Sequence, residues 1–310
     1  MIRTMSYEKV LLTGGSGFVG SAVLDRLLDS GRTVHALTRD STIDRPNVKS
    51  FVGGLFNPSA LAAAANGCDA VIHLVGIIKE SGEQTFEHVH VEGTARVIEA
   101  AKTAGIKRLV HMSALGAKAD SQSVYSRTKF AAEERVRSSE LDHTIFRPSM
   151  IHGPRGEFMK MLAGWAKGTA LPYAFMPFFG RGVFGLSPAS LQPIFVDDVA
   201  RCFVEALDHP ETIGQSYDLG GPETFTWPEM YDTAAHLIAG KTKLVVGLPA
   251  WYGKLVASLI PGRFLPFNKS QVVMAVEDNV ADPSVIEKTF GFKPQRFPDA
   301  LRSYVEELKK

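Results

Sequence analysis

The sequence predicts an α/β fold in which a doubly wound parallel sheet carries helices on both faces, joined to a smaller, partly interleaved region. Three observations predict it. Short apolar segments alternate with segments of helical period through the first 150 residues, as in repeated βαβ units. A glycine-rich turn follows the first apolar segment. After Pro154 the alternation gives way to a stretch rich in Phe, Gly and Pro, which indicates the second region.

The first strand, turn and helix are expected in KVLLTGGSGFVGSAVLDRLLDSG, residues 9–31. Val10, Leu11 and Leu12 form a short apolar run, typical of a strand that is buried on both faces of a parallel sheet. Apolar residues then recur at helical spacing as far as Leu28, and Gly31 follows where a helix commonly ends in glycine.

The later elements follow at similar intervals. We expect strands at 33–38, 48–52, 69–74, 108–113, 143–147 and 215–219, and helices at 18–30, 58–65, 84–104, 124–139, 227–239 and 298–308. Residues 192–210 predict a short strand and an amphipathic helix capped by Asp197 or Asp198. We assign residues 6–155 and 190–220 to a nucleotide-binding domain, and residues 156–189 and 221–310 to a smaller region that binds a substrate or partner.

Composition excludes several classes of protein. The chain has 45% hydrophobic and 22% charged residues, an ordinary composition for a globular protein. Its 34 Lys and Arg against 33 Asp and Glu give a net charge of +1, which argues against a nucleic-acid partner. Cys68 and Cys202 are too far apart in sequence to suggest a metal-binding pair or a disulfide framework.

No targeting or spanning segment is expected. The first nine residues, MIRTMSYEK, lack the apolar centre of a signal peptide. The most apolar stretch, residues 244–267, is interrupted by Pro249, Pro261 and Pro266 and is too short between them to span a membrane. We therefore expect a cytoplasmic protein, with peripheral attachment to a membrane left open.

The glycine turn indicates a nucleotide site. Gly15, Gly17 and Gly20 spell G-x-G-x-x-G, and Gly14, Gly17 and Gly20 spell G-x-x-G-x-x-G after Thr13. A strand, a glycine turn and a helix together direct backbone N–H groups and the positive end of the helix dipole at a pyrophosphate. The alternative is a tight turn that binds no ligand.

The end of the second predicted strand bears on the choice of cofactor. An acidic residue at this position, about 20 residues past the glycines, commonly holds the ribose 2′-hydroxyl of NAD. Here the strand is followed by Arg39, whose guanidinium suits the 2′-phosphate of NADP. NADP is therefore favoured over NAD, although Asp40 leaves NAD open as the alternative.

Three residues are candidates for the chemistry. Tyr125 and Lys129 lie four apart in a predicted helix and therefore on one face. Ser113 ends a predicted strand, and ligands bind beyond the carboxyl ends of parallel strands. A nearby ammonium is expected to lower the pKa of the Tyr125 phenol, which would then exchange a proton with a substrate. Lys129 would also bind the nicotinamide ribose, and Ser113 would anchor the substrate oxygen.

These motifs resemble the short-chain dehydrogenase/reductase superfamily, in its extended or atypical forms with a Rossmann fold. Seven further segments resemble the group that contains the NADPH-binding accessory subunit of the complex I alpha subcomplex. They are HLVGIIKE (73–80), VHVEGT (89–94), HMSALGA (111–117), YSRTK (125–129), RPSMIHGP (147–154), QPIFVDDVA (192–200) and LGGPE (219–223).

The resemblance implies the cofactor contacts. The pyrophosphate would be cradled by Gly14, Ser16, Gly17, Phe18 and Val19. The path from adenine to ribose would be lined by Leu74, Val75 and Gly76, and Pro148 would adjoin the nicotinamide. Gly20 would pack the helix on the sheet. Two departures from the family pattern stand out. Gly54 replaces an Asp that often meets adenine, and His90 replaces an Asn that supports a proton-relay water, so a full relay is in doubt.

Other polar and aromatic residues are given structural roles. His88 and His90 do not share a helix face, and no metal site is expected. His73 and His111 fall on strands, where core packing is the simplest interpretation. The aromatic residues of 158–184 and 244–267 form either the core of the smaller region or an apolar cleft for a quinone- or isoprenoid-like substrate, opening on a membrane surface.

Two classes of function follow. The first is an NADP-dependent oxidoreductase that moves a hydride to or from a carbonyl or alcohol carbon of an apolar small molecule, with a nucleotide-sugar epimerase or dehydratase as a variant. The second is an NADPH-binding structural or assembly protein, associated with a respiratory or quinone-biosynthesis complex and without turnover. The retained Ser113, Tyr125 and Lys129 favour the enzyme.

Overall fold

The computed structural model describes residues 7–260, 265 and 267–310, and the structural statements below concern these residues. Its centre is a seven-stranded sheet in the order β11-β6-β5-β4-β1-β2-β3, and every neighbouring pair is parallel. The strands are β1 (Lys9–Thr13), β2 (Thr33–Thr38), β3 (Val48–Val52), β4 (Ala70–His73), β5 (Arg108–Met112), β6 (Asp142–Pro148) and β11 (Gln215–Leu219).

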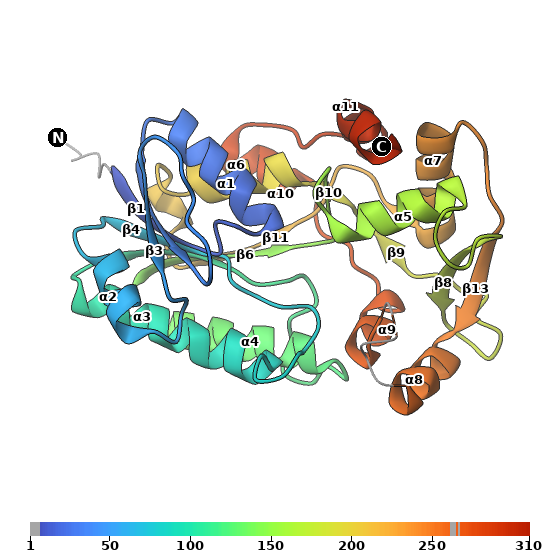
Figure 1. The fold of residues 1–310 in the computed structure, drawn as a ribbon, viewed down its shortest axis with the longest axis horizontal. Coiled ribbons are helices and arrows are strands. Elements are labelled where there is room, and N and C mark those ends of the chain that lie inside the picture. Colours follow the sequence, from blue (N-terminus) through green and yellow to red (C-terminus); the bar gives the residue numbers. More distant parts are fainter. Residues whose placement is uncertain (1–6, 261–264, 266) are drawn as a thin grey trace.

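Helices cover both faces of this sheet (Figure 1). One face carries α1 (Phe18–Asp29), α6 (Val196–Glu205) and α10 (Ser284–Phe290). The other carries α2 (Pro58–Ala65), α3 (Gly93–Thr103) and α4 (Val124–Arg137). Alternate strand residues serve the two cores: Leu12 and Val110 face α1, whereas Leu11 and Leu109 face α2 and α3. The predicted doubly wound Rossmann fold is therefore confirmed.

A second group of elements lies at one end of the sheet (Figure 1). Its strands are β7 (Ile151–His152), β8 (Met176–Gly180), β9 (Ser190–Leu191), β10 (Ile194–Phe195), β12 (Phe225–Thr226) and β13 (Val245–Pro249). Its helices are α5 (Glu157–Lys167), α7 (Trp227–Ala239), α8 (Ala250–Leu259), α9 (Lys269–Ala275) and α11 (Phe297–Lys309), and a short 3-10 turn, η2 (Pro210–Thr212), precedes β11. The chain enters this group after β6 and returns to the sheet through β11. The domain boundaries given above stay a prediction.

Most predicted elements match the structure within one or two residues, and two expectations were wrong. The helix predicted at 84–104 is present, but its first part is a π-helix, η1 (Glu87–Glu92), that runs directly into α3. Neither Asp197 nor Asp198 caps α6, whose N-cap is Phe195; Asp198 instead accepts a hydrogen bond from the Gln295 N–H at 2.8 Å. Residues 159–188, expected to form loops and short helices, contain the greater part of α5 and also a strand, β8, that was not expected.

The search for a membrane span gave no candidate in the described chain: none of its helices combines the length and apolarity that crossing a bilayer needs.

Candidate active site

The glycine turn between β1 and α1 is shaped by close backbone contacts. Gly14 has a φ of +82°, and a Cβ on it would lie 3.2 Å from the Val75 nitrogen. A Cβ on Gly20 would overlap the Gly14 carbonyl oxygen, so only glycine lets the helix sit this close to the turn. Gly17, the N-cap of α1, provides no side-chain cap. The first N–H groups of α1 therefore remain open to an anion at the exposed side of Ser16 and Gly17.

Arg39 follows β2 at the same edge of the sheet. Its side chain is 64% exposed, and it forms an ion pair at 3.6 Å with Asp40, whose side chain is 84% exposed. A Cβ on Gly54, which follows β3, would lie 3.1 Å from the Arg39 Cγ. The alkyl stem is thus held close to the backbone after β3, while the guanidinium is exposed to solvent.

Helix α4 presents Tyr125, Lys129 and Glu133 on one face, because they are four residues apart. The Ser123 side chain begins the helix by accepting a hydrogen bond from the Ser126 N–H at 3.3 Å. The predicted common face of Tyr125 and Lys129 is therefore present. Glu133, one turn further along, escaped the sequence prediction, although the same spacing would have found it.

Lys129 is a buried cation with one protein partner. Its side chain is 3% exposed, and its ammonium donates to the Met112 carbonyl at 3.0 Å. A Cβ on Gly76 would lie 2.9 Å from Nζ, so the ammonium reaches the backbone just beyond β4. Burial lowers the pKa of Lys129 to about 8, although the charge of Glu133 acts in the opposite direction. Two of its three N–H donors have no partner among the described residues.

The Tyr125 ring is fixed by edge-on contacts. Its centroid lies 5.8 Å from that of Phe86 and 5.4 Å from that of His90, with interplanar angles of 82° and 86°. Burial raises the pKa of Tyr125 to about 12. The expectation that Lys129 lowers this pKa was wrong, because burial is the cause that sets the direction of the shift. The phenol is therefore neutral at physiological pH and carries a proton that it can donate.

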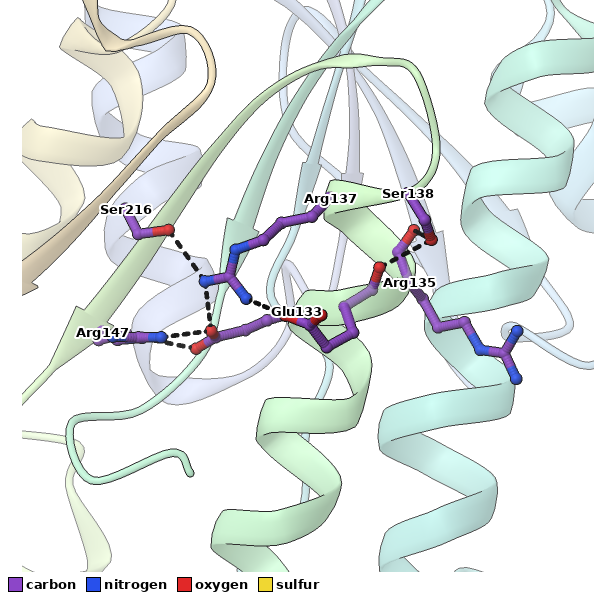
Figure 2. A network of polar contacts seen from close by, with 7 residues as sticks. Glu133, Arg135, Arg137, Ser138, Arg147 and Ser216 are labelled. Carbon is purple, nitrogen blue, oxygen red and sulfur yellow. Dashed lines mark hydrogen bonds and ion pairs between the residues drawn. The ribbon is translucent and has the colours of Figure 1, made fainter. Parts of the chain in front are cut away.

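A buried ion cluster lies one turn beyond Lys129 (Figure 2). Glu133 is fully buried and accepts hydrogen bonds from Arg147 Nε at 2.7 Å, Arg147 Nη2 at 2.6 Å and Arg137 Nη2 at 2.7 Å. Burial alone would raise the pKa of Glu133, but the bonds from Arg147, the nearby Ser113 hydroxyl and the charge of Arg147 lower it. The cluster joins α4 to β6, and Arg137 extends it to Ser216 of β11 at 3.1 Å.

Ser113 lies directly beyond β5, as predicted, and is 3% exposed. Its hydroxyl oxygen lies near the Glu133 carboxylate but is buried without a hydrogen-bond partner among the described residues. Its role as the substrate-oxygen anchor remains a prediction.

His90, which the resemblance places where the family often has an Asn, makes three polar contacts. Nδ1 lies 2.9 Å from Thr128 Oγ1, and Nε2 lies 3.1 Å from both the N–H and the carbonyl oxygen of Ile77. Burial, reinforced by the charge of Lys129, lowers the pKa of His90 to about 2, so the ring is neutral. The π-helical turn η1 places this imidazole between α4 and the segment after β4.

His73 and His111 are two further buried histidines, paired on the neighbouring strands β4 and β5. His73 Nδ1 lies 2.6 Å from Thr13 Oγ1, and Nε2 lies 3.1 Å from Thr94 Oγ1. The His111 ring is 5.4 Å from that of His73, and both of its nitrogens are buried without a hydrogen-bond partner in the described residues. Burial lowers the pKa of His73 to about 3. No group of three metal-ligating side chains occurs in the part of the chain that the structure describes.

The other predicted cofactor residues line the same edge. The Leu74 N–H donates to the Thr13 carbonyl at 3.1 Å, which places Val75 and Gly76 next to the glycine turn. Pro148 ends β6, and its carbonyl accepts from the Leu115 N–H at 3.0 Å. The structure thus brings residues of the β1, β4, β5 and β6 ends together at the carboxyl edge of the sheet, the usual place for ligands in such folds. A cavity of about 490 Å³ beside Lys9 and Thr33 lies at the opposite edge of the sheet, away from Tyr125 and Lys129.

The comparisons with known proteins assign the class. The NAD dependent epimerase/dehydratase family matches residues 10–220, and the chain belongs to this family. It is therefore a Rossmann-fold protein of the NAD(P)-binding epimerase and short-chain dehydrogenase/reductase group, as the resemblance of its motifs indicates.

Individual relatives include both enzymes and complex subunits. The chain is 32% identical over 235 residues to NADH dehydrogenase [ubiquinone] 1 alpha subcomplex subunit 9, mitochondrial, of Arabidopsis thaliana, covering 71% of this chain and 56% of that protein. It is 29% identical to the ceramide reductase of Caulobacter vibrioides, covering 76% and 72%. In structure it resembles the UDP-glucose 4-epimerase of Thermus thermophilus in complex with NAD, with a TM-score of 0.73 at 24% identity over 97% of this chain and 99% of that one.

Proposed function

We propose that this protein is an NADP-dependent oxidoreductase that reduces the carbonyl carbon of an apolar small molecule. Ser113, Tyr125 and Lys129 would act on the substrate and the nicotinamide ribose. Gly14, Ser16, Gly17, Phe18, Val19, Arg39, Leu74, Val75, Gly76, Lys129 and Pro148 would hold the cofactor.

The observation that carries the proposal is the state of Lys129. An ammonium that is 3% exposed and makes a single hydrogen bond, to a backbone carbonyl, is costly to the cofactor-free fold. Its unused donors lie beside Gly76, at the strand end where a dinucleotide ribose is expected. Ribose hydroxyls would supply the missing acceptors, and a bound dinucleotide would thereby offset the cost of burying this charge.

The protonation states favour reduction. NADPH, when bound, supplies the hydride. The neutral Tyr125 hydroxyl would donate its proton to the carbonyl oxygen of the substrate as that oxygen gains negative charge. Lys129, positively charged near neutral pH, would stabilise the resulting phenolate from one helical turn away. His90 would hold the Ile77 backbone and Thr128 around this pair through its three contacts.

Two features support the finer assignments. The exposed guanidinium of Arg39 supports NADP over NAD, because it can pair with the 2′-phosphate. A relative that is named a ceramide reductase supports an apolar substrate, and the aromatic residues around β8 and α8 are consistent with one.

The test is NADPH oxidation by the purified protein with a panel of quinones, isoprenoid carbonyls, ceramide-type ketones and nucleotide sugars. We expect turnover with an apolar carbonyl, and loss of turnover by roughly a hundredfold or more in Tyr125→Phe with unchanged NADPH affinity. Tyr217→Phe, the same one-oxygen change at a tyrosine that packs on Phe290 of α10, is the matched control. Equal turnover in Tyr125→Phe and the wild type would contradict the role of Tyr125.

A second candidate function is a nucleotide-binding structural subunit without turnover. The similarity to a complex I subunit favours it. Tight NADPH binding, with no oxidation by any member of the panel and no effect of Tyr125→Phe on stability of the bound form, would support this candidate. Turnover of nucleotide sugars alone would instead support an epimerase or dehydratase.

A further inference from the structure

One end of the molecule presents an apolar surface to solvent. It consists of residues 182–187, which follow β8, and the outer face of α8; we call it the α8 surface. Six of its large apolar side chains are between 49% and 76% exposed: Val183, Phe184, Leu186, Trp251, Leu255 and Leu259. In Figure 1, α8 lies at the extremity of the fold, beyond β8 and β13. Exposure of this many neighbouring apolar side chains marks an interaction site.

The α8 surface is held in place by packing and by a hydrogen bond. A Cβ on Gly253 would overlap the Phe179 ring, so the glycine face of α8 packs directly on β8. Trp251, Leu255 and Leu259 recur at four-residue spacing on the outer face. The Trp251 indole N–H donates to the Val183 carbonyl at 3.0 Å, which ties the helix to the loop. Gly185, with a φ of +70°, brings that loop against the backbone of β13.

The α8 surface carries positive and no negative charge. Residues 182–187 and 250–259, which contain it, hold one Lys and no Asp or Glu. Lys254 is the one charged residue of α8, and its ammonium donates to the Gln122 side chain at 3.4 Å. Apolar side chains, interfacial Trp251 and Tyr252, and an excess of positive charge are the features of a helix that lies in a membrane interface.

The α8 surface also adjoins the candidate active site. Gln122, the partner of Lys254, is three residues before Tyr125. Asn268, which caps α9, donates to the Ile78 carbonyl at 2.8 Å, just beyond the cofactor residues 74–76. Ile78 and Val124, which are 51% and 43% exposed, add two apolar side chains between the α8 surface and the candidate active site. A molecule dissolved in a bilayer under α8 would therefore be close to Tyr125.

We propose that the α8 surface docks this protein on an anionic lipid bilayer, with α8 parallel to the membrane plane. A second copy of the chain is a poorer partner, because each copy would bring Lys254 and no acidic side chain of its α8 surface to the contact. A bilayer supplies both the apolar interior and the negative surface that these residues match. The proposal does not depend on turnover.

Vesicle flotation with the full-length protein tests it. We expect the protein to float with phosphatidylcholine vesicles that contain phosphatidylglycerol and to remain largely in solution with phosphatidylcholine alone. The double variant Trp251→Ser/Leu255→Ser should bind at least about tenfold more weakly, since it removes two apolar anchors. Lys254→Glu should weaken binding to the anionic vesicles specifically. The matched control is Leu171→Ser/Leu244→Ser. These two exposed leucines precede β8 and β13, whereas the α8 surface follows these parallel strands.

Depth-dependent quenching by brominated lipids gives a second measurement. Trp251 is 56% exposed and Trp165 is buried, so quenching that disappears in Trp251→Phe would place α8 in the bilayer. Circular dichroism and melting temperatures confirm that each variant is folded. Binding that is equal in the α8 and control variants, or no binding to anionic vesicles, would overturn the proposal. So would a dimer in sedimentation velocity that Trp251→Ser/Leu255→Ser dissociates, because a second copy would then cover the surface.

Discussion

Glu133 and Arg147 form a bidentate ion pair inside the protein, with Nε–Oε1 and Nη2–Oε2 distances of 2.7 and 2.6 Å. Glu133 lies on the face of α4 that carries Tyr125 and Lys129, and Arg147 directly precedes Pro148 at the end of β6. The pair therefore fixes the helix that holds the candidate catalytic residues against the strand that ends beside the cofactor site.

Removing the Glu133 charge should destabilise the fold. Glu133→Gln leaves the Arg147 and Arg137 guanidinium groups without their shared carboxylate, which is expected to cost about 3–5 kcal/mol in the free energy of unfolding by urea. Glu134→Gln, which changes an exposed neighbour that also pairs with Arg137, should cost less than about 1 kcal/mol. Equal losses would contradict a special role for the buried pair.

The same pair predicts an acid sensitivity. The pKa of Glu133 is lowered in the folded protein, so the unfolded chain binds this proton at a higher pH than the folded chain does. The stabilisation is therefore complete above the ordinary glutamate value of about 4.3 and is lost as the pH falls through the lower folded value. Glu133→Gln should flatten this part of the stability curve, whereas Glu134→Gln should not.

Lys129→Met should stabilise the cofactor-free protein while it abolishes turnover. The folded pKa of about 8 lies below the ordinary value of Lys, so the unfolding free energy of the wild type rises with pH between about 8 and 10. Removing the buried charge should add on the order of 1–3 kcal/mol at pH 7 and abolish that slope. Lys102→Met, at an exposed position paired with Glu140, is the control. A less stable Lys129→Met protein would show that the ammonium is well satisfied in the fold.

Gly20→Ala should abolish dinucleotide binding. The new Cβ would overlap the Gly14 carbonyl oxygen, so the turn and α1 must move apart. Gly31→Ala, at the other end of α1, has open space around it and a φ of +81°, and should cost about 1 kcal/mol of stability without affecting NADPH affinity. Isothermal titration with NADPH distinguishes the two; retained affinity in Gly20→Ala would place the cofactor elsewhere.

Arg39→Ala tests cofactor choice. Loss of the guanidinium should weaken NADPH binding by roughly 10–100-fold and leave NADH binding nearly unchanged, because only NADPH carries the 2′-phosphate. Asp40→Asn is the counterpart: a larger loss for NADH would identify Asp40 as a ribose ligand. Equal losses for both cofactors in Arg39→Ala would remove this residue from the adenosine site.

The sheet and the Tyr125–Lys129 face could be predicted because both follow from periodicity. Buried parallel strands appear as short apolar runs, and four-residue spacing on a helix fixes a common face. Among the elements missed were β8, β13 and α8, which lie in segments rich in Pro, Gly and Phe. Their order depends on tertiary packing, such as the contact of Gly253 with Phe179, which no local pattern encodes.

The details of the site were beyond the sequence for a different reason. A π-helical turn puts His90 against Ile77, and burial rather than the nearby ammonium sets the pKa of Tyr125. Both depend on how much water the assembled fold excludes. Glu133 could have been predicted from its four-residue spacing. Its pairing with Arg147 could not, because it depends on how α4 lies along β6.

The sheet order has a consequence for biosynthesis. β6 is complete when Pro148 leaves the ribosome, but its outer neighbour β11 ends only at Leu219, after the chain has travelled through α5, β8 and α6. Until then the backbone edge of β6 has no partner strand from this sheet, and such edges are prone to pair with other chains. A nascent polypeptide arrested between these two points would thus be the form most exposed to aggregation, and the one for which a chaperone matters most.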